Sequence, residues 1–353
     1  MRSKHKHWHD VLEYCESIRD GRKIACTETK QAVERFYRDL DNPEYELVHK
    51  APEFCISIIE STIKHQQGET LDGKPLRDKP FLLLPFHKFI IYNLVGFNLA
   101  GTDIVRFHEA LIYIPRKNIK TSFSAALAWA LSLWYRNSGA KTYITAAALM
   151  QSLESYNFLT YNVKNMGEWD KDGGHVHIID NNNEHSLKAN LGEGSFFIRA
   201  LAANPDAQDS LNCNIAICDE IHAFKQPKQY NLFKEAMKAY TNKLLIGIST
   251  AGDNEQAFLG QRLKYCRKIL NGSVKDEQYF VFMACANPDE NGEIDYTNPI
   301  VHEMANPAYG VSIRPNEILN DALQAQNDPQ QRKDFFAKSL NVYTNAIKAW
   351  FNL

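Results

Sequence analysis

Apolar residues follow two different periods along the chain, and the change between them predicts the fold class. Near the amino terminus they recur with the helical period, which predicts amphipathic helices over residues 30–40 and 51–65. From about residue 81, short apolar runs alternate with helical stretches. The expected strands are 111–114, 142–146, 215–218, 244–249 and 279–284. Apolar strands alternating with helices predict an α/β fold whose mostly parallel central sheet is flanked by helices.

The same pattern divides the chain into three regions. We expect residues 1–79 to form a helical N-terminal lid, residues 80–310 the α/β core, and residues 311–353 a helical linker toward a further domain. The stretch 66–80 contains Gly and Pro residues and marks the first boundary. The last residues are apolar and lack a polar end, so we expect the native polypeptide to continue.

Composition narrows the class of protein. Of the 353 residues, 44% are hydrophobic, which is enough for a sizeable core. The formal net charge of −2 excludes attraction to nucleic acid through overall positive charge but leaves local basic patches open. Seven cysteines without a Cys-x-x-Cys pair, and no secretory signal, predict a cytosol-like location. No apolar stretch is long enough to cross a bilayer, so no membrane contact is expected.

A strand, a basic loop and a Lys-Thr pair follow one another in residues 112–121. A phosphate-binding loop has this context: backbone N–H groups hold the phosphates, Lys120 neutralises their charge and the Thr121 hydroxyl binds Mg²⁺. Ile114 and Ile119 replace the two usual glycines. Because β-branched residues tolerate positive φ poorly, we expect this loop to follow a different backbone path. The alternative is a basic surface turn above a buried helix.

Two acidic residues at the end of an apolar strand favour nucleotide binding. Ligands of α/β sheets bind at the carboxyl ends of the strands, where Asp219 can hold Mg²⁺ and Glu220 can orient the attacking water. The alternative is an acidic pair that simply begins a helix. Another strand, 244–249, leads into Ser-Thr-Ala-Gly, which includes Thr250 and has little specificity by itself.

Together these segments resemble the large terminase subunit of tailed bacteriophages, the ATPase that drives double-stranded DNA into the capsid. The resemblance covers nearly the whole chain. Residues 83–90 look like the adenine-recognition segment of the family, with His87 in place of its usual Gln. Residues 115–121 are similar to the family's divergent phosphate loop, with Ile119 at its glycine. Residues 219–223 match its Asp-Glu-x-His signature, and residues 249–252 match its coupling motif.

The resemblance implies roles for individual residues. The nucleotide is expected to contact Phe86, His87, Arg106, Pro115, Arg116, Lys117, Asn118, Ile119, Lys120 and Thr121. Catalysis is expected from Glu220, Lys120, Arg116 and Thr250, and Mg²⁺ binding from Thr121 and Asp219. An arginine from a neighbouring subunit would complete the ATPase site, and the two candidates are Arg199 and Arg262.

The resemblance also implies P-loop ATPase activity that depends on Mg²⁺ and moves DNA into a procapsid in the host cytoplasm. The implied partners are double-stranded DNA, the portal protein, the small terminase subunit and further copies in a ring. In the family an RNase H-like nuclease domain follows, so this chain alone should not cut DNA. Two alternatives stay open. One is a catalytically weak P-loop module that docks to the portal or another partner, and the other is a helicase-like translocase outside packaging.

Overall fold

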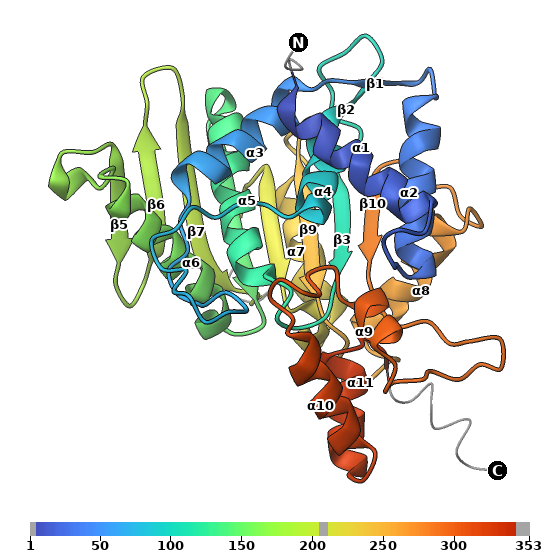
Figure 1. The fold of residues 1–353 in the computed structure, drawn as a ribbon. Coiled ribbons are helices and arrows are strands. Elements are labelled where there is room, and N and C mark those ends of the chain that lie inside the picture. Colours follow the sequence, from blue (N-terminus) through green and yellow to red (C-terminus); the bar gives the residue numbers. More distant parts are fainter. Residues whose placement is uncertain (1–4, 205–210, 344–353) are drawn as a thin grey trace.

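An eight-stranded sheet forms the centre of the computed structural model, which describes residues 5–204 and 211–343 (Figure 1). Its strand order is β10-β3-β9-β8-β4-β7-β6-β5. The parallel strands are β3 (Glu109–Tyr113), β4 (Ala140–Ala146), β7 (Ser195–Ala202), β8 (Ile215–Asp219), β9 (Leu244–Ser249) and β10 (Tyr279–Met283). Two antiparallel strands, β6 (His185–Asn190) and β5 (Val176–Asp180), extend one edge. The predicted α/β fold with a mostly parallel sheet is therefore confirmed.

Helices cover the middle of the sheet on both faces, which explains why its strands are apolar throughout. Helices α5 (Lys120–Trp134) and α6 (Leu149–Asn165) lie in front of the sheet in Figure 1, and α7 (Pro227–Ala236) and α8 (Phe258–Leu270) lie behind it. Every residue of β3, β8, β9 and β10 is buried. Strands β5, β6 and β7 contain exposed or half-buried residues, and the pattern of hydrophobic residues did not predict them.

The amino-terminal helices share the core of the sheet. They are α1 (Lys6–Arg19), α2 (Thr27–Leu40), α3 (Lys50–Thr62) and α4 (Pro85–Gly96), and a short antiparallel pair joins β1 (Tyr45–Leu47) to β2 (Phe97–Leu99). Ala32, Val33 and Phe36 form the buried stripe of α2, as its periodicity predicted. One hydrophobic cluster runs from Val11 through these helices into the strands. Residues before position 80 are therefore packed directly onto the sheet.

The carboxyl-terminal helices form a second, smaller hydrophobic cluster. They are α9 (Pro299–Ala305), α10 (Pro315–Ala325) and α11 (Pro329–Lys338), each with a proline in its first turn. The cluster includes residues from Ala286 to Leu340, so its packing continues across position 310. Short 3-10 helices are Arg136–Ser138, Asp170–Asp172 and Ile221–Ala223. Among the described residues, no helix combines the length and apolarity needed to cross a membrane.

Candidate functional site

The segments singled out in the sequence meet at one edge of the sheet, at the carboxyl ends of β3, β8 and β9. The register pairs Tyr113 with Ser249 and Asp219 with Ile248, so the three following loops leave the sheet side by side. The Lys120 Nζ atom lies 3.2 Å from Glu220 Oε1. The Thr250 hydroxyl lies 3.5 Å from Glu220 Oε2. The phosphate-loop lysine, the acidic pair and the end of the coupling segment are thus in one place.

The backbone of the phosphate loop differs from what Ile119 led us to expect. Ile119 adopts φ 63° and ψ 23°, the left-handed conformation that suits glycine, and Lys117 has φ 62°. The expectation that an isoleucine would force a different path is therefore wrong at this residue. Such a conformation costs a side chain with a Cβ atom about 1–2 kcal/mol. It persists because neighbouring contacts hold the loop.

Asn118 provides those contacts, and its side chain serves the loop's structure. It is fully buried and donates to Asn306 Oδ1 at 2.8 Å, while its own Oδ1 accepts the N–H of Ala308 at 3.0 Å. A second contact joins the Ser312 hydroxyl to the carbonyl of Lys117. The Asn118 side chain is therefore fully engaged within the protein. Only the backbone of this residue remains to face phosphate.

Thr121 and Arg116 flank this buried part of the loop. Thr121 stands in the first turn of α5 and is half-buried. Arg116 has an exposed side chain, and its backbone N–H donates to the carbonyl of Lys338 at 3.0 Å. The positive end of α5 and two cationic side chains, Arg116 and Lys120, therefore surround the loop, as binding of an anion requires.

Asp219 and Glu220 titrate in opposite directions although they are adjacent. Burial and the nearby Glu220 charge raise the pKa of Asp219 to about 6. Burial also acts to raise the pKa of Glu220, but the hydrogen bond from His222 and the charge of Lys120 outweigh it and lower the pKa to about 2. Burial lowers the pKa of Lys120, and the two carboxylates oppose that shift. Glu220 is therefore ionised and paired with Lys120, whereas no cation within the described part of the chain pairs with Asp219 at hydrogen-bond distance.

His222 and Ser249 belong to this cluster, although the sequence analysis assigned them no role. His222 Nδ1 lies 2.8 Å from Glu220 Oε2 and 3.1 Å from the Ser249 hydroxyl. The backbone N–H of His222 also donates to that hydroxyl. His222 thus orients Glu220 and ties it to the end of β9. The Asp-Glu-x-His spacing contained the signal, because it returns the histidine to the acidic pair after one short turn.

Asn341 connects the coupling segment to the end of β10. Its Oδ1 accepts the N–H of Ala251 at 2.7 Å, and its Nδ2 donates to the carbonyl of Ala284 at 2.9 Å. The Tyr113 hydroxyl donates to its backbone carbonyl. The buried Asn341 therefore holds the ends of β9 and β10 together through its side-chain amide and the end of β3 through its backbone carbonyl.

Phe86 and His87 lie at the start of α4, beside the first turn of α5. His87 stacks on Phe123 with 4.4 Å between ring centroids, and its Nδ1 accepts the N–H of Leu84. Burial lowers its pKa to about 3, so the ring is neutral and its proton resides on Nε2, which has no partner among the described residues. Phe86 lines a cavity of about 280 Å³ together with Tyr14 of α1 and Tyr309. Aromatic walls suit a flat ring such as a base.

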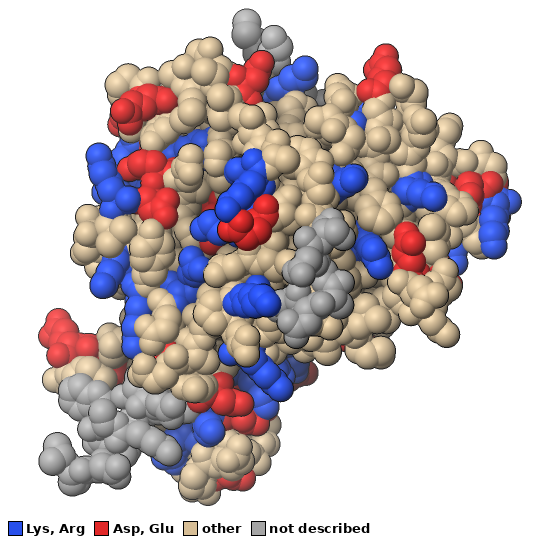
Figure 2. All heavy atoms as spheres, turned by 180° about the vertical axis from the view of Figure 1, so that it is seen from behind, with Lys and Arg blue, Asp and Glu red and all other residues tan. Residues whose placement is uncertain are grey.

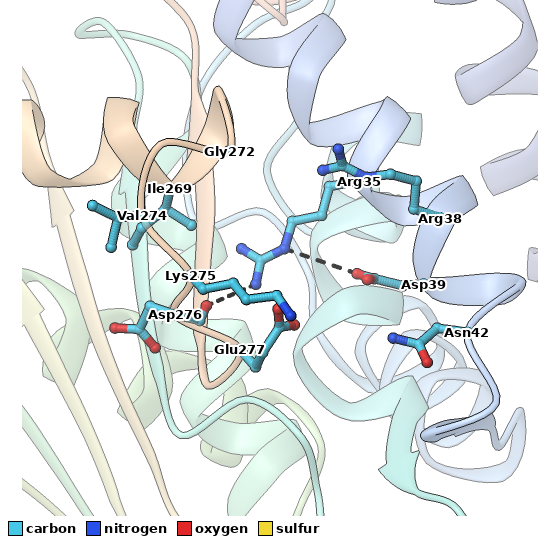
Figure 3. Close-up of a pocket in the computed structure, with 10 residues that line it drawn as sticks. All are labelled: Arg35, Arg38, Asp39, Asn42, Ile269, Gly272, Val274, Lys275, Asp276 and Glu277. Atoms are coloured by element: carbon cyan, nitrogen blue, oxygen red, sulfur yellow. Dashed lines mark hydrogen bonds and ion pairs between the residues drawn. The ribbon is translucent and has the colours of Figure 1, made fainter.

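Arg106 lies at the wrong edge of the sheet for nucleotide binding. It precedes β3, whereas the phosphate loop follows β3. Its side chain is 1% exposed and pairs with Asp39 and with Glu277, the latter at 2.5 Å. Figure 3 shows the adjacent cavity of about 330 Å³, in which Arg35 pairs with Asp39. Arg106 therefore joins α2 to the turn before β10, which corrects its expected contact with the nucleotide.

The two candidate arginines differ in how firmly their own chain engages them. Arg262 lies 3.5 Å from Glu109 and packs against the rings of Tyr230, Phe258 and Tyr279. It is thus held inside its own subunit, and the structure gives no support to it as a donor to a neighbour. Arg199 is half-buried in β7, and its guanidinium donates to the carbonyl of Asn183 at 3.3 Å.

The parallel sheet with a Lys-Thr loop after β3 and an acidic pair after β8 defines a P-loop nucleotide-binding protein. The family model "Terminase large subunit, ATPase domain" matches residues 85–268, just over half of the chain. The chain therefore belongs to the family of terminase large-subunit ATPase domains, the ATPase modules of packaging motors.

The similarity of the chain to individual proteins is low in sequence identity. The chain is 22% identical to the large terminase of bacteriophage HK97, with a TM-score of 0.64 over 83% of this chain and 55% of that one. It is 11% identical to the large terminase ATPase domain of Thermus phage P74-26, with a TM-score of 0.43 over 66% of this chain and 88% of that one. Protein YmfN of Escherichia coli (strain K12) is 27% identical over 179 residues, which is 48% of this chain and 38% of YmfN. The chain thus covers 55% of the HK97 protein and 38% of YmfN, less than two thirds of each.

Proposed function

We propose that this chain hydrolyses ATP with Mg²⁺ to drive double-stranded DNA into a procapsid. The observation that carries the proposal is the meeting of Lys120, Asp219 and Glu220 at one sheet edge, in a chain of this family. Thr250, 3.5 Å from Glu220, would report the state of the γ-phosphate to the segment held by Asn341. In-line attack by water needs charge neutralisation and a positioned nucleophile, and these groups supply both.

The residues present fit a magnesium ion. Mg²⁺ prefers oxygen ligands, and the Thr121 hydroxyl and the Asp219 carboxylate are the candidates. One Asp219 oxygen accepts the N–H of Glu220 at 2.9 Å, which leaves the other for a metal. When bound, the ion neutralises phosphate charge. Lys120 and Arg116 would bind the phosphates, and Glu220, once Lys120 turns toward them, would orient and deprotonate the water.

The base of the nucleotide would occupy the cavity lined by Phe86, Tyr14 and Tyr309. This cavity adjoins the phosphate loop through the same segment, 306–312, that contacts Asn118 and Lys117. His87 would act from behind Phe86, by fixing the start of α4 through its bond to Leu84.

We also propose the partners of the motor and the roles of the three regions of the chain. The partners would be DNA, the portal protein, the small terminase subunit and further copies of the chain in a ring, all in the host cytoplasm. Residues 1–79 would serve as a lid, residues 80–310 as the ATPase core and residues 311–353 as the linker to a nuclease domain. DNA cleavage would require that domain, so residues 1–353 alone should leave plasmid DNA intact with Mg²⁺.

Calorimetry with a non-hydrolysable ATP analogue and Mg²⁺ tests the nucleotide site. The parent chain should bind, and Lys120→Ala should weaken binding at least about tenfold, because Lys120 is the buried cation of the loop. Lys188→Ala is the matched control, since this lysine is exposed on β6. Absence of binding by the folded parent at millimolar nucleotide would overturn the proposal and favour a docking module.

A further inference from the structure

Three potential metal ligands meet away from the ATPase site, where α2 begins beside the end of β10. Cys26 is the N-cap of α2, Glu28 lies in its first turn, and Cys285 follows β10. The Sγ atoms of both cysteines and a carboxylate oxygen of Glu28 all lie within 4.8 Å of one another, and all three residues are buried. Within residues 5–204 and 211–343, no other group of three such ligands is this compact.

We propose that Cys26, Cys285 and Glu28 bind one zinc ion, which fastens α2 to the end of β10. Thiolate sulfur and carboxylate oxygen are ligands that Zn²⁺ accepts, and two thiolates disfavour Mg²⁺ or Ca²⁺. Bond lengths of about 2.3 Å to sulfur and about 2.0 Å to oxygen place tetrahedral ligands roughly 3.5 Å apart. Zinc binding would require side-chain rotations that bring the three atoms, now within 4.8 Å of one another, to that separation.

Neighbouring groups hold Glu28 and Cys26 in place, and the Cys26 thiol also donates to the carbonyl of Met283 at 3.2 Å, a hydrogen bond that zinc binding would replace. Glu28 accepts hydrogen bonds from Arg267 Nε at 2.8 Å and from Asn287 Nδ2 at 2.9 Å. Each carboxylate oxygen has two lone pairs, so these bonds leave acceptor capacity for an ion. Cys26 Sγ accepts the N–H of Thr29, which fixes the sulfur at the start of α2. Hydrogen bonds of this kind typically support metal ligands from outside.

The charges of this buried group suit a divalent cation. Two thiolates, Glu28 and Zn²⁺ sum to one negative charge, which Arg267 cancels because it pairs with Glu28. Metal binding would release the two thiol protons, so no net charge is buried. With a monovalent cation in place of Zn²⁺, the same groups would keep a net charge of −1.

A cavity of about 600 Å³ reaches one of the three ligands, Glu28, and would admit an ion from that side. Glu28, Arg267 and Asn287 line it, together with Tyr113. Water from the cavity would supply the fourth ligand. The zinc would join the amino-terminal helices to the chain at Ala286, the point at which the second hydrophobic cluster begins.

Cobalt binding to the metal-stripped 353-residue chain tests this proposal, because Co²⁺ bound to thiolates gives a sulfur-to-metal charge-transfer band. One Co²⁺ per chain should produce the band, and Zn²⁺ should displace it. Cys26→Ser and Cys285→Ser should lose the band. Glu28→Gln should keep it with an affinity at least about tenfold weaker, because loss of even a residue that only supports a ligand weakens a metal site by about 10–100-fold. Cys55→Ser, a buried cysteine of α3, is the matched control and should behave as the parent.

Circular dichroism of each variant separates loss of the site from loss of the fold. Zinc should raise the melting temperature of the parent and of Cys55→Ser but not that of Cys285→Ser. No band in the folded parent, or equal loss of the band in Cys55→Ser, would overturn the proposal. A chain that binds no cobalt but whose Cys26 and Cys285 thiols are oxidised to a disulfide by glutathione disulfide would also overturn the proposal. The pair would then be assigned to thiol oxidation. None of these measurements uses ATPase activity.

Discussion

At the scale of single residues, the environment of each carboxylate decides its chemistry. Asp219 and Glu220 are adjacent and acidic, yet the first has a raised pKa and the second a lowered one. The difference arises because Glu220 faces Lys120 and His222, whereas Asp219 is buried beside another negative charge. The sequence predicted that both acids lie at the strand end, but the lowered pKa of Glu220 depends on His222 and on Lys120, and Lys120 is a hundred positions away.

Replacing Glu220 with Gln should separate nucleotide binding from hydrolysis. The amide keeps the shape of the side chain but cannot take a proton, so turnover should fall about 10²–10⁴-fold while nucleotide affinity stays within about threefold. Steady-state phosphate release and calorimetry measure the two effects. Glu193→Gln, an exposed position before β7, is the control. A wild-type rate in the Glu220 variant would show that another residue activates the water.

Magnesium binding should weaken below about pH 6, because a metal must displace the proton that Asp219 then carries. The expected loss is about tenfold per pH unit below the pKa. In Glu220→Gln the inflection should move to lower pH, since one cause of the raised pKa is removed. Titrating Mg²⁺ with bound fluorescent nucleotide between about pH 5 and pH 7.5 measures this. An inflection that stays in place would mean that the Glu220 charge does not act on Asp219.

The same two shifts have opposite consequences for folding stability. The raised pKa of Asp219 favours the protonated folded state, so its contribution is lost as the pH rises through about 6. The lowered pKa of Glu220 favours the ionised folded state, so its contribution is lost as the pH falls from its ordinary value near 4.5 toward about 2.

At the scale of elements, the phosphate loop and the segment that follows β10 behave as one unit. Asn118 of the loop and Asn306 after α9 bond to each other, and Asn306 also donates to the carbonyls of His302 and Ser339. The left-handed Ile119 sits inside this frame. The pattern of apolar residues predicted the strand and helix on either side of the loop, but not the partner of Asn118, which is 188 positions away.

A double-mutant cycle on Asn118 and Asn306 tests this coupling. Each single change to Ala leaves a buried amide without its partner, so each should lower the free energy of unfolding by about 1–3 kcal/mol. The double variant should lose less than the sum of both. Urea unfolding measures these values, and Asn183→Ala is an exposed control. If the two losses simply add, the side chains do not stabilise each other. Nucleotide affinity should fall with either change, since the loop loses its support.

At the scale of the whole molecule, we propose that an arginine from another subunit completes the ATPase site. Of the two candidate arginines, Arg262 is held by Glu109 and three aromatic rings, which leaves Arg199 as the stronger candidate. Seen from behind, Lys and Arg are interspersed with Asp and Glu, so this face presents no broad surface of one sign (Figure 2). That agrees with the formal net charge of −2 and places any DNA attraction in local groups.

Mixing two inactive variants tests whether Arg199 acts between subunits. Arg199→Ala keeps Glu220, and Glu220→Gln keeps Arg199, so a mixed ring contains sites with both groups. ATPase activity should be low in each variant and recover on mixing, by a mechanism in which the arginine stabilises transition-state charge. A mixture of Arg262→Ala with Glu220→Gln should show no such recovery. Activity of the mixture equal to the mean of the separate variants would exclude a donated Arg199.

The sequence by itself determined the elements of this protein and much of its candidate site. The strand period predicted five of the six parallel strands, all but β7, because burial on both faces shows in neighbouring residues of the sequence. Lys120, Asp219 and Thr250 could be placed at strand ends for the same local reason. Strands β5 and β6 mix buried and exposed residues and contain no apolar run, so their sequences did not predict strands.

Only the tertiary structure decided how these elements meet. It placed β9 between β3 and β8, brought His222 onto Glu220, and set Arg106 at the edge opposite the phosphate loop. It also gave Ile119 a conformation that its side chain disfavours. These outcomes depend on contacts between residues far apart in the chain. The local pattern of apolar and polar positions does not determine which distant residues come into contact.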